Sequence, residues 1–109
     1  MDEQDFRKHA DKALETLRRR LLDLGDEHNF EVEGEGEKLE LLFEEPEEVR
    51  FVISPNTAAR QIWISALSTS FKLGWSETVG AFVMDKTGET LTTVMSRILT
   101  QQIGHAVSV

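Results

Sequence analysis

Residues 60–65 of the chain read RQIWIS, an alternation of polar and apolar side chains that is typical of a β-strand with one buried face. Ile62 and Ile64 are expected to point into a core, while Trp63 and its polar neighbours point away from it. Similar short runs occur at residues 30–33, 38–44, 50–54, 71–75 and 81–84. The segments between the runs are too short for parallel crossovers, and Gly34-Glu35-Gly36 is expected to form a hairpin turn. The sequence therefore predicts about six antiparallel strands.

Two amphipathic helices are predicted on either side of the strands. Apolar residues recur at steps of three and four from Phe6 to Leu24 and again from Leu91 to Leu99. Gly25 and Gly104 are expected to end these helices. Two helices with apolar stripes need a large apolar surface, and one face of the sheet is the candidate. The expected fold is an α+β, two-layer sandwich in the order helix, six-stranded antiparallel sheet, helix, forming a single domain over residues 1–109.

The charge of the chain is strongly regional. The net charge is −8, and residues 23–48 contain twelve acids with Lys38 as the only lysine or arginine. Such a surface repels nucleic acid and attracts cations and basic protein surfaces. No nucleic-acid partner is therefore expected.

Several other classes of protein are disfavoured by residue content. The chain has no cysteine, which excludes disulfides, thiolate metal sites and cysteine nucleophiles. Its three histidines lack the spacing of a zinc site, and no serine–histidine–acid set is recognisable. No apolar run reaches the roughly 18 residues of a membrane helix. The acidic start, MDEQDF, differs from a signal or transit peptide, so the expected location is the cytoplasm, without a membrane.

Three motifs, together with the order helix, six strands, helix, resemble the frataxin family in its bacterial CyaY type. They are the RQIWIS run, the stretch DKTGETL at residues 85–91 followed by Gln101-Gln102, and Phe6 with Ala10-Asp11. The resemblance spans nearly the whole chain and implies an iron-binding accessory protein, a donor or regulator, of iron–sulfur cluster assembly. Its implied partners are cysteine desulfurase and the iron–sulfur scaffold protein. The alternative is an adaptor of the same machinery whose metal binding is incidental; no enzyme activity is expected, although the resemblance leaves ferroxidase activity open.

The resemblance also implies a weak, exposed site for Fe2+ or Fe3+ on an acidic ridge. Carboxylate oxygens are suitable ligands for such ions. The matching positions are Asp11, Glu15, Asp23, Asp26, Glu27, Glu31, Glu33 and Glu44. Arg18, Arg19 and Leu22 depart from the acidic pattern of the family and weaken the middle of the ridge. The competing interpretation is a solvated acidic face that only keeps the protein soluble.

A second implied surface is the open face of the sheet around the tryptophan of RQIWIS. An exposed tryptophan on a sheet is a candidate hot spot for a protein partner. The residues expected to contact the partner are Gln61, Trp63, Ser65, Ser54 and Lys72. The competing interpretation is an indole lying flat on sheet neighbours such as Val52. The chain is expected to be a monomer, with iron-dependent oligomerisation left open.

Overall fold

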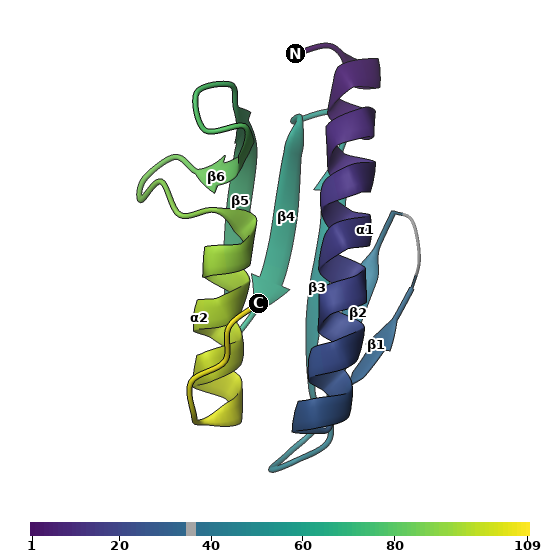
Figure 1. Ribbon diagram of the computed structural model, residues 1–109, viewed down its shortest axis with the longest axis vertical. Coiled ribbons are helices and arrows are strands. Elements are labelled where there is room, and N and C mark those ends of the chain that lie inside the picture. Colours follow the sequence, from purple (N-terminus) through teal and green to yellow (C-terminus); the bar gives the residue numbers. More distant parts are fainter. Residues whose placement is uncertain (35–36) are drawn as a thin grey trace.

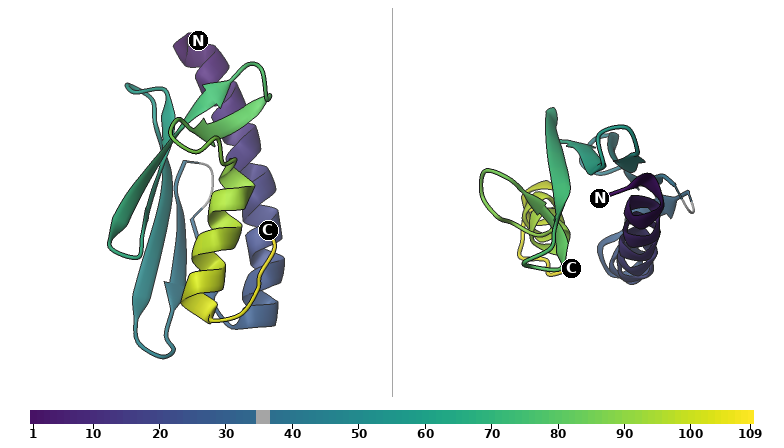
Figure 2. Two further views of the ribbon diagram at one scale, coloured as in Figure 1. Left: turned by 90° about the vertical axis from the view of Figure 1, so that its left-hand side faces the viewer. Right: turned by 90° about the horizontal axis from the view of Figure 1, so that it is seen from above.

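The fold comes from a computed structural model that describes residues 1–34 and 37–109. In chain order its elements are α1 (Glu3–His28), β1 (Glu31–Glu33), β2 (Leu39–Phe43), β3 (Val49–Asn56), β4 (Gln61–Ala66), β5 (Thr69–Ser76), β6 (Ala81–Met84) and α2 (Leu91–Ile103). The strands form one antiparallel sheet in the order β1-β2-β3-β4-β5-β6. Both helices lie on the same face of it (Figures 1 and 2). The predicted two-layer sandwich is confirmed; the expected turn at Gly34-Glu35-Gly36 falls partly outside the described residues.

Helix α1 begins at a side-chain cap and runs past the glycine expected to end it. The Asp2 carboxylate accepts a hydrogen bond from the Asp5 amide at 2.8 Å. The helix ends at Asn29, whose φ of 63° is left-handed and whose N–H donates to the Gly25 carbonyl. The predicted end at Gly25 is therefore wrong. Gly25 is needed for close approach instead, because a Cβ there would lie 2.6 Å from the Phe30 carbonyl oxygen.

The RQIWIS run forms β4 and has the predicted alternation. Ile62 and Ile64 are 0% and 1% exposed, whereas Trp63 is 37% exposed on the opposite face. Strand β3 is longer than expected and continues through Pro55 to Asn56. Beyond Ile53 this strand pairs only with β4, and such one-sided pairing tolerates a residue without an N–H.

The helices cover a continuous apolar core. Fully buried residues come from both layers, including Phe6 and Leu21 of α1, Ile98 of α2, and Phe51 and Leu73 of the sheet. Neither helix can bury its apolar stripe alone. Packing against the sheet therefore stabilises both helices and the sheet together. None of the described helices has the length and hydropathy needed to cross a membrane.

The segment after α2 folds back along the two helices. Gly104 ends α2 with a φ of 93°, as predicted. Val107 is buried, and its N–H donates to the Thr100 hydroxyl at 3.0 Å. Arg20 of α1 donates from Nη2 to the Ser108 carbonyl at 2.8 Å. These bonds join α1 to α2 through the C-terminal tail, which is seen beside α2 in Figure 1.

Candidate functional site

Three acidic residues border one depression between the end of α1 and the edge of the sheet. Asp26, Glu31 and Glu44 line one depression of about 290 Å³, and we call these three residues the acidic cluster. Phe30 and Phe43 are buried beneath them, with ring centroids 5.0 Å apart. Since strand side chains alternate, burying these two rings keeps the following residues, Glu31 and Glu44, at the surface.

Glu48 extends the acidic cluster and is a residue that the sequence analysis did not select. A second depression of about 330 Å³ is lined by Glu31, Glu44 and Glu48. The register pairs Phe43 of β2 with Val49 of β3, so Glu44 and Glu48 flank that pair. The signal that could have found Glu48 is this hairpin register, which a run of acids around Pro46 obscures.

Two other predicted ridge acids lie next to the acidic cluster. Asp23 precedes Asp26 by three residues and Glu27 by four, spacings at which helix side chains are neighbours. The Glu27 carboxylate lies 3.6 Å from Nε2 of His28. Asp23 and Glu27 thus add negative charge around the depression, but neither of them lines it.

The remaining predicted ridge acids are separated from the acidic cluster. At about 1.5 Å of rise per residue, Glu15 lies about 16 Å along α1 from Asp26, and Asp11 about 22 Å. The Glu15 carboxylate is 3.0 Å from Nε of Arg19 and 3.8 Å from Nη1 of Arg18. The arginines that depart from the family pattern therefore neutralise part of the ridge.

Glu33 lies on β1 directly opposite Glu40 of β2. Like charges at opposed positions repel. Glu40 is balanced by Lys38 at 3.1 Å and by Arg50 at 3.8 Å. The pair therefore sits in a mixed-charge patch rather than in the acidic cluster.

No preformed metal shell is present among residues 1–34 and 37–109. In that part of the chain, no three His, Asp or Glu side chains are arranged to enclose an ion. The acidic cluster is exposed, so an ion held there would keep much of its hydration. The arrangement can concentrate cations through charge, and it would release them readily.

The predicted partner-binding residues occupy adjacent positions on the open face of the sheet. Trp63 is paired with Ser54 on one side and Lys72 on the other, and Gln61 and Ser65 lie two residues away on the same strand. The Lys72 ammonium is 4.8 Å from the centre of the indole, and the indole N–H donates to Oε1 of Gln61 at 2.8 Å. Trp63 and its neighbour Val52 both line a shallow depression of about 310 Å³ on this face. The indole is thus held by its neighbours and still exposed.

The model of the frataxin-like domain matches residues 1–105 of the 109. The chain belongs to the frataxin-like family. Its fold matches that of a frataxin from Psychromonas ingrahamii with a TM-score of 0.75, at 20% identity and over 99% of this chain and 97% of that one. The predicted family and fold are confirmed.

Two curated relatives of this frataxin-like chain carry the same name, iron–sulfur cluster assembly protein CyaY. The one from Thioalkalivibrio sulfidiphilus is 25% identical over 107 residues, covering 98% of each chain. The one from Azotobacter vinelandii is 25% identical over 96 residues, covering 86% of each chain.

Proposed function

We propose that this frataxin-like protein is an iron-binding accessory protein of iron–sulfur cluster assembly, docking on the complex of cysteine desulfurase and scaffold protein. The observation that carries the proposal is the match, over 86% to 98% of the chain, to proteins named for iron–sulfur cluster assembly. The acidic cluster and the exposed Trp63 supply a surface for each of the two tasks. The chain would act as one domain, as a monomer, in the cytoplasm.

The acidic cluster is the proposed centre of iron binding. Asp26 of α1, Glu31 of β1 and Glu44, which follows β2, offer carboxylate oxygens around one depression. The carboxylates repel one another, and a bound cation would remove that repulsion. At physiological ionic strength the screening length is about 8 Å, so Asp23 and Glu27, within one turn of Asp26, add to the same field.

Asp11 and Glu15 form a second, weaker position in this proposal. They lie about 16 to 22 Å from Asp26, beyond the screening length, and so cannot share a field with it. Glu15 is also engaged by Arg18 and Arg19, which compete with any cation. Glu33 lies opposite Glu40, whose charge is already balanced by Lys38. Glu33 would therefore contribute mainly to the general negative potential.

The open face of the sheet is the proposed docking surface. Trp63 would supply the apolar anchor, because indole rings that bury on binding contribute most strongly to protein interfaces. Lys72 would bring positive charge for an acidic partner group, while Gln61, Ser54 and Ser65 would supply hydrogen bonds. Holding the indole in place before binding reduces the entropy lost on docking.

A second function is favoured by the lack of a preformed metal shell in the described residues: an adaptor whose metal binding is incidental. The two functions differ in their response to the triple variant Asp26→Asn, Glu31→Gln, Glu44→Gln. If the protein handles iron, this variant loses most of the wild-type effect on the rate of cluster formation by purified desulfurase and scaffold. If it is an adaptor, the variant keeps the full effect.

The proposed function is tested by capture from the native cytoplasm. Wild-type protein and the Trp63→Ala variant are used as bait, and the captured proteins are identified by mass spectrometry. The proposal expects cysteine desulfurase and scaffold protein with the wild type and their loss with the variant. Capture of neither protein by the wild type would contradict it.

A further inference from the structure

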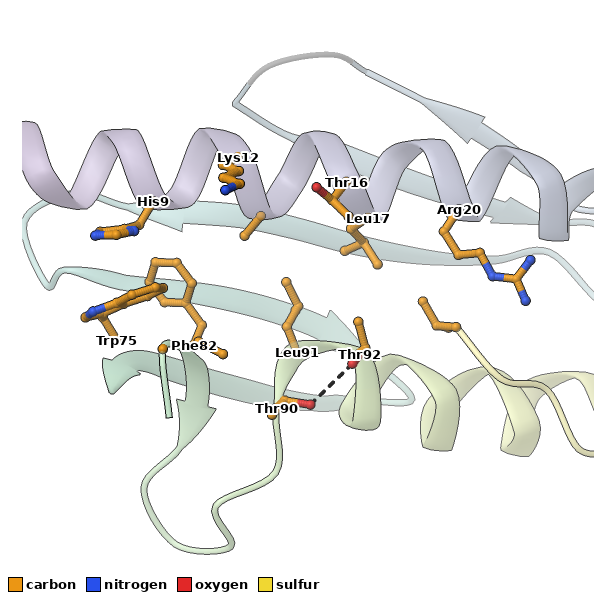
Figure 3. Close-up of a pocket in the computed structure, with 14 residues that line it drawn as sticks. His9, Lys12, Thr16, Leu17, Arg20, Trp75, Phe82, Thr90, Leu91 and Thr92 are labelled. Atoms are coloured by element: carbon orange, nitrogen blue, oxygen red, sulfur yellow. Dashed lines mark hydrogen bonds between the residues drawn. The ribbon is translucent and has the colours of Figure 1, made fainter. Parts of the chain in front are cut away.

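A cavity of the described chain lies between the two helices, away from both surfaces assigned above. Its volume is about 660 Å³, within the 300 to 1,000 Å³ typical of small-molecule sites. Figure 3 shows Leu17 of α1 pointing toward Phe82 of β6 and Leu91 of α2, with Lys12 and Thr16 on the same helix. Apolar surface dominates the interior: Ala13 and Trp75 are partly exposed there, and Leu17, Phe82 and Leu91 form a buried floor, 2%, 1% and 7% exposed. The cavity is therefore suited to an apolar body.

Each end of the cavity is defined by a specific contact. At one end the imidazole of His9 stacks on the indole of Trp75, with ring centroids 3.8 Å apart (Figure 3). At the other end Val109 lies near Arg20, whose guanidinium is held by the Ser108 carbonyl at 2.8 Å. The ends are built from α1, β5 and the C-terminal tail, so a ligand between them would touch segments that are distant in sequence.

The charge of the cavity is opposite to the charge of the protein. The chain carries −8, yet the described lining residues include Lys12, Arg20 and His9 and no aspartate or glutamate. Lys12, Thr16 and Arg20 follow one another at steps of four, which places them along one side of α1. Lys12 has no carboxylate partner among residues 1–34 and 37–109. A cationic wall beside apolar surface attracts an anion with an apolar body.

We propose that this inter-helix cavity binds a small amphipathic carboxylate. The apolar body lies against Ala13 and Trp75, over the buried Leu17, Phe82 and Leu91, and the carboxylate faces Lys12 and Arg20. A cation is repelled by the same wall, and a neutral apolar molecule gains only the burial of its chain. The site is separate from iron handling and stands or falls independently of it.

The binding test compares decanoate with decanol, which has the same chain length and no charge. In a Trp63→Phe background Trp75 is the only tryptophan, and it lies at one end of the cavity. We expect decanoate to change the Trp75 fluorescence saturably and to bind about tenfold more tightly than decanol, because an ionised ligand makes the stronger hydrogen bonds. Equal affinity for the two, or no saturable change with either, overturns the proposal.

Two variants and a control locate the binding. Lys12→Gln is expected to weaken decanoate about threefold and leave decanol unchanged, whereas the exposed Lys86→Gln, with the same loss of charge, leaves both unchanged. Ala13→Leu fills the cavity from α1 and is expected to abolish binding of both molecules. Thermal unfolding checks that each variant is folded. Unaltered decanoate binding in folded Ala13→Leu, or equal losses in the two lysine variants, contradicts the assignment.

Discussion

Replacing Trp63 by alanine should separate docking from folding. The indole is 37% exposed, and its removal deletes one surface hydrogen bond to Gln61 and one contact with the Lys72 ammonium. An exposed cation–π contact contributes about 0.5–1 kcal/mol, and a hydrogen bond has a net contribution of about 0.5–1.5 kcal/mol, at the low end of that range on an exposed surface where water replaces it. We therefore expect the free energy of unfolding to fall by about 1 kcal/mol.

The expected effect of Trp63→Ala on docking is larger. A buried tryptophan anchor at an interface contributes about 2 kcal/mol or more to binding. Its loss therefore raises the Kd about 30-fold. Isothermal titration calorimetry against purified desulfurase–scaffold complex measures this change. Val79→Ala is the matched control, because Val79 is 58% exposed in the turn between β5 and β6 and should leave the Kd within about twofold. The reasoning is refuted if folded Trp63→Ala binds with wild-type affinity, or if both variants lose affinity equally.

Three further predictions concern stability. Gly25→Ala should lower the free energy of unfolding by about 1–3 kcal/mol in urea melts, because its Cβ would lie 2.6 Å from the Phe30 carbonyl oxygen; an unchanged midpoint would contradict this. Ser68→Gly should raise the Tm by several degrees in calorimetry, because Ser68 has a φ of 59°, which costs about 1 kcal/mol in a residue with a side chain; a lower Tm would show that this cost is absent. The hydrogen bonds from Arg97 hold the pKa of Glu89 below its ordinary value of 4.5, so this pair stabilises the fold above that pH and its contribution is lost as pH falls through the folded pKa. Glu89→Gln should therefore cost up to about 1 kcal/mol at about pH 7 and progressively less as the pH falls below 4.5, and a pH-independent cost in chemical unfolding would rule the mechanism out.

The layers of the fold were predictable because burial alone decides them. A stripe such as Phe6, Ala10 and Leu14 has one way to be hidden, and the period-two alternation of Ile62 and Ile64 determines which side of β4 faces the helices. Since this alternation leaves Trp63 on the other side, the composition of the open face followed from the same pattern.

The errors at element ends have local physical causes. A glycine after a periodic stripe usually indicates a helix end, yet Asn29 also tolerates the left-handed conformation and carries the cap here. The strand predicted at residues 50–54 stops before Pro55, because proline cannot donate a hydrogen bond to a sheet. The register of β3 shows that this part of the strand has a single neighbour, and that information is not local.

The candidate sites were less predictable than the fold. The acids at the end of α1 are evident in the sequence. That Asp26 and Glu44 line one depression depends on how the helix end approaches β2, which the sequence does not show. The spacing of Glu15 to Arg18 and Arg19 on one helix already indicates ion pairs, and the side-chain distances of 3.8 and 3.0 Å confirm them. The inter-helix cavity has no sequence signal, because its lining comes from distant segments.

In the proposed function, iron is held loosely at the acidic cluster. The most direct measurement is an anaerobic titration with Fe2+ followed by the shifts and broadening of backbone amide resonances. The test variant is Asp26→Asn, Glu31→Gln, Glu44→Gln. A control with the same change in net charge, made at exposed acids outside the acidic cluster, is Asp5→Asn, Glu77→Gln, Asp85→Asn.

In the wild type and the control, Fe2+ should perturb residues 26–31 and 42–45 first and in parallel, with weaker effects at residues 11–15. The test variant should lose the response at residues 26–31 and 42–45. A wild-type response centred elsewhere, or one that the test variant retains in full, would contradict iron binding at the acidic cluster.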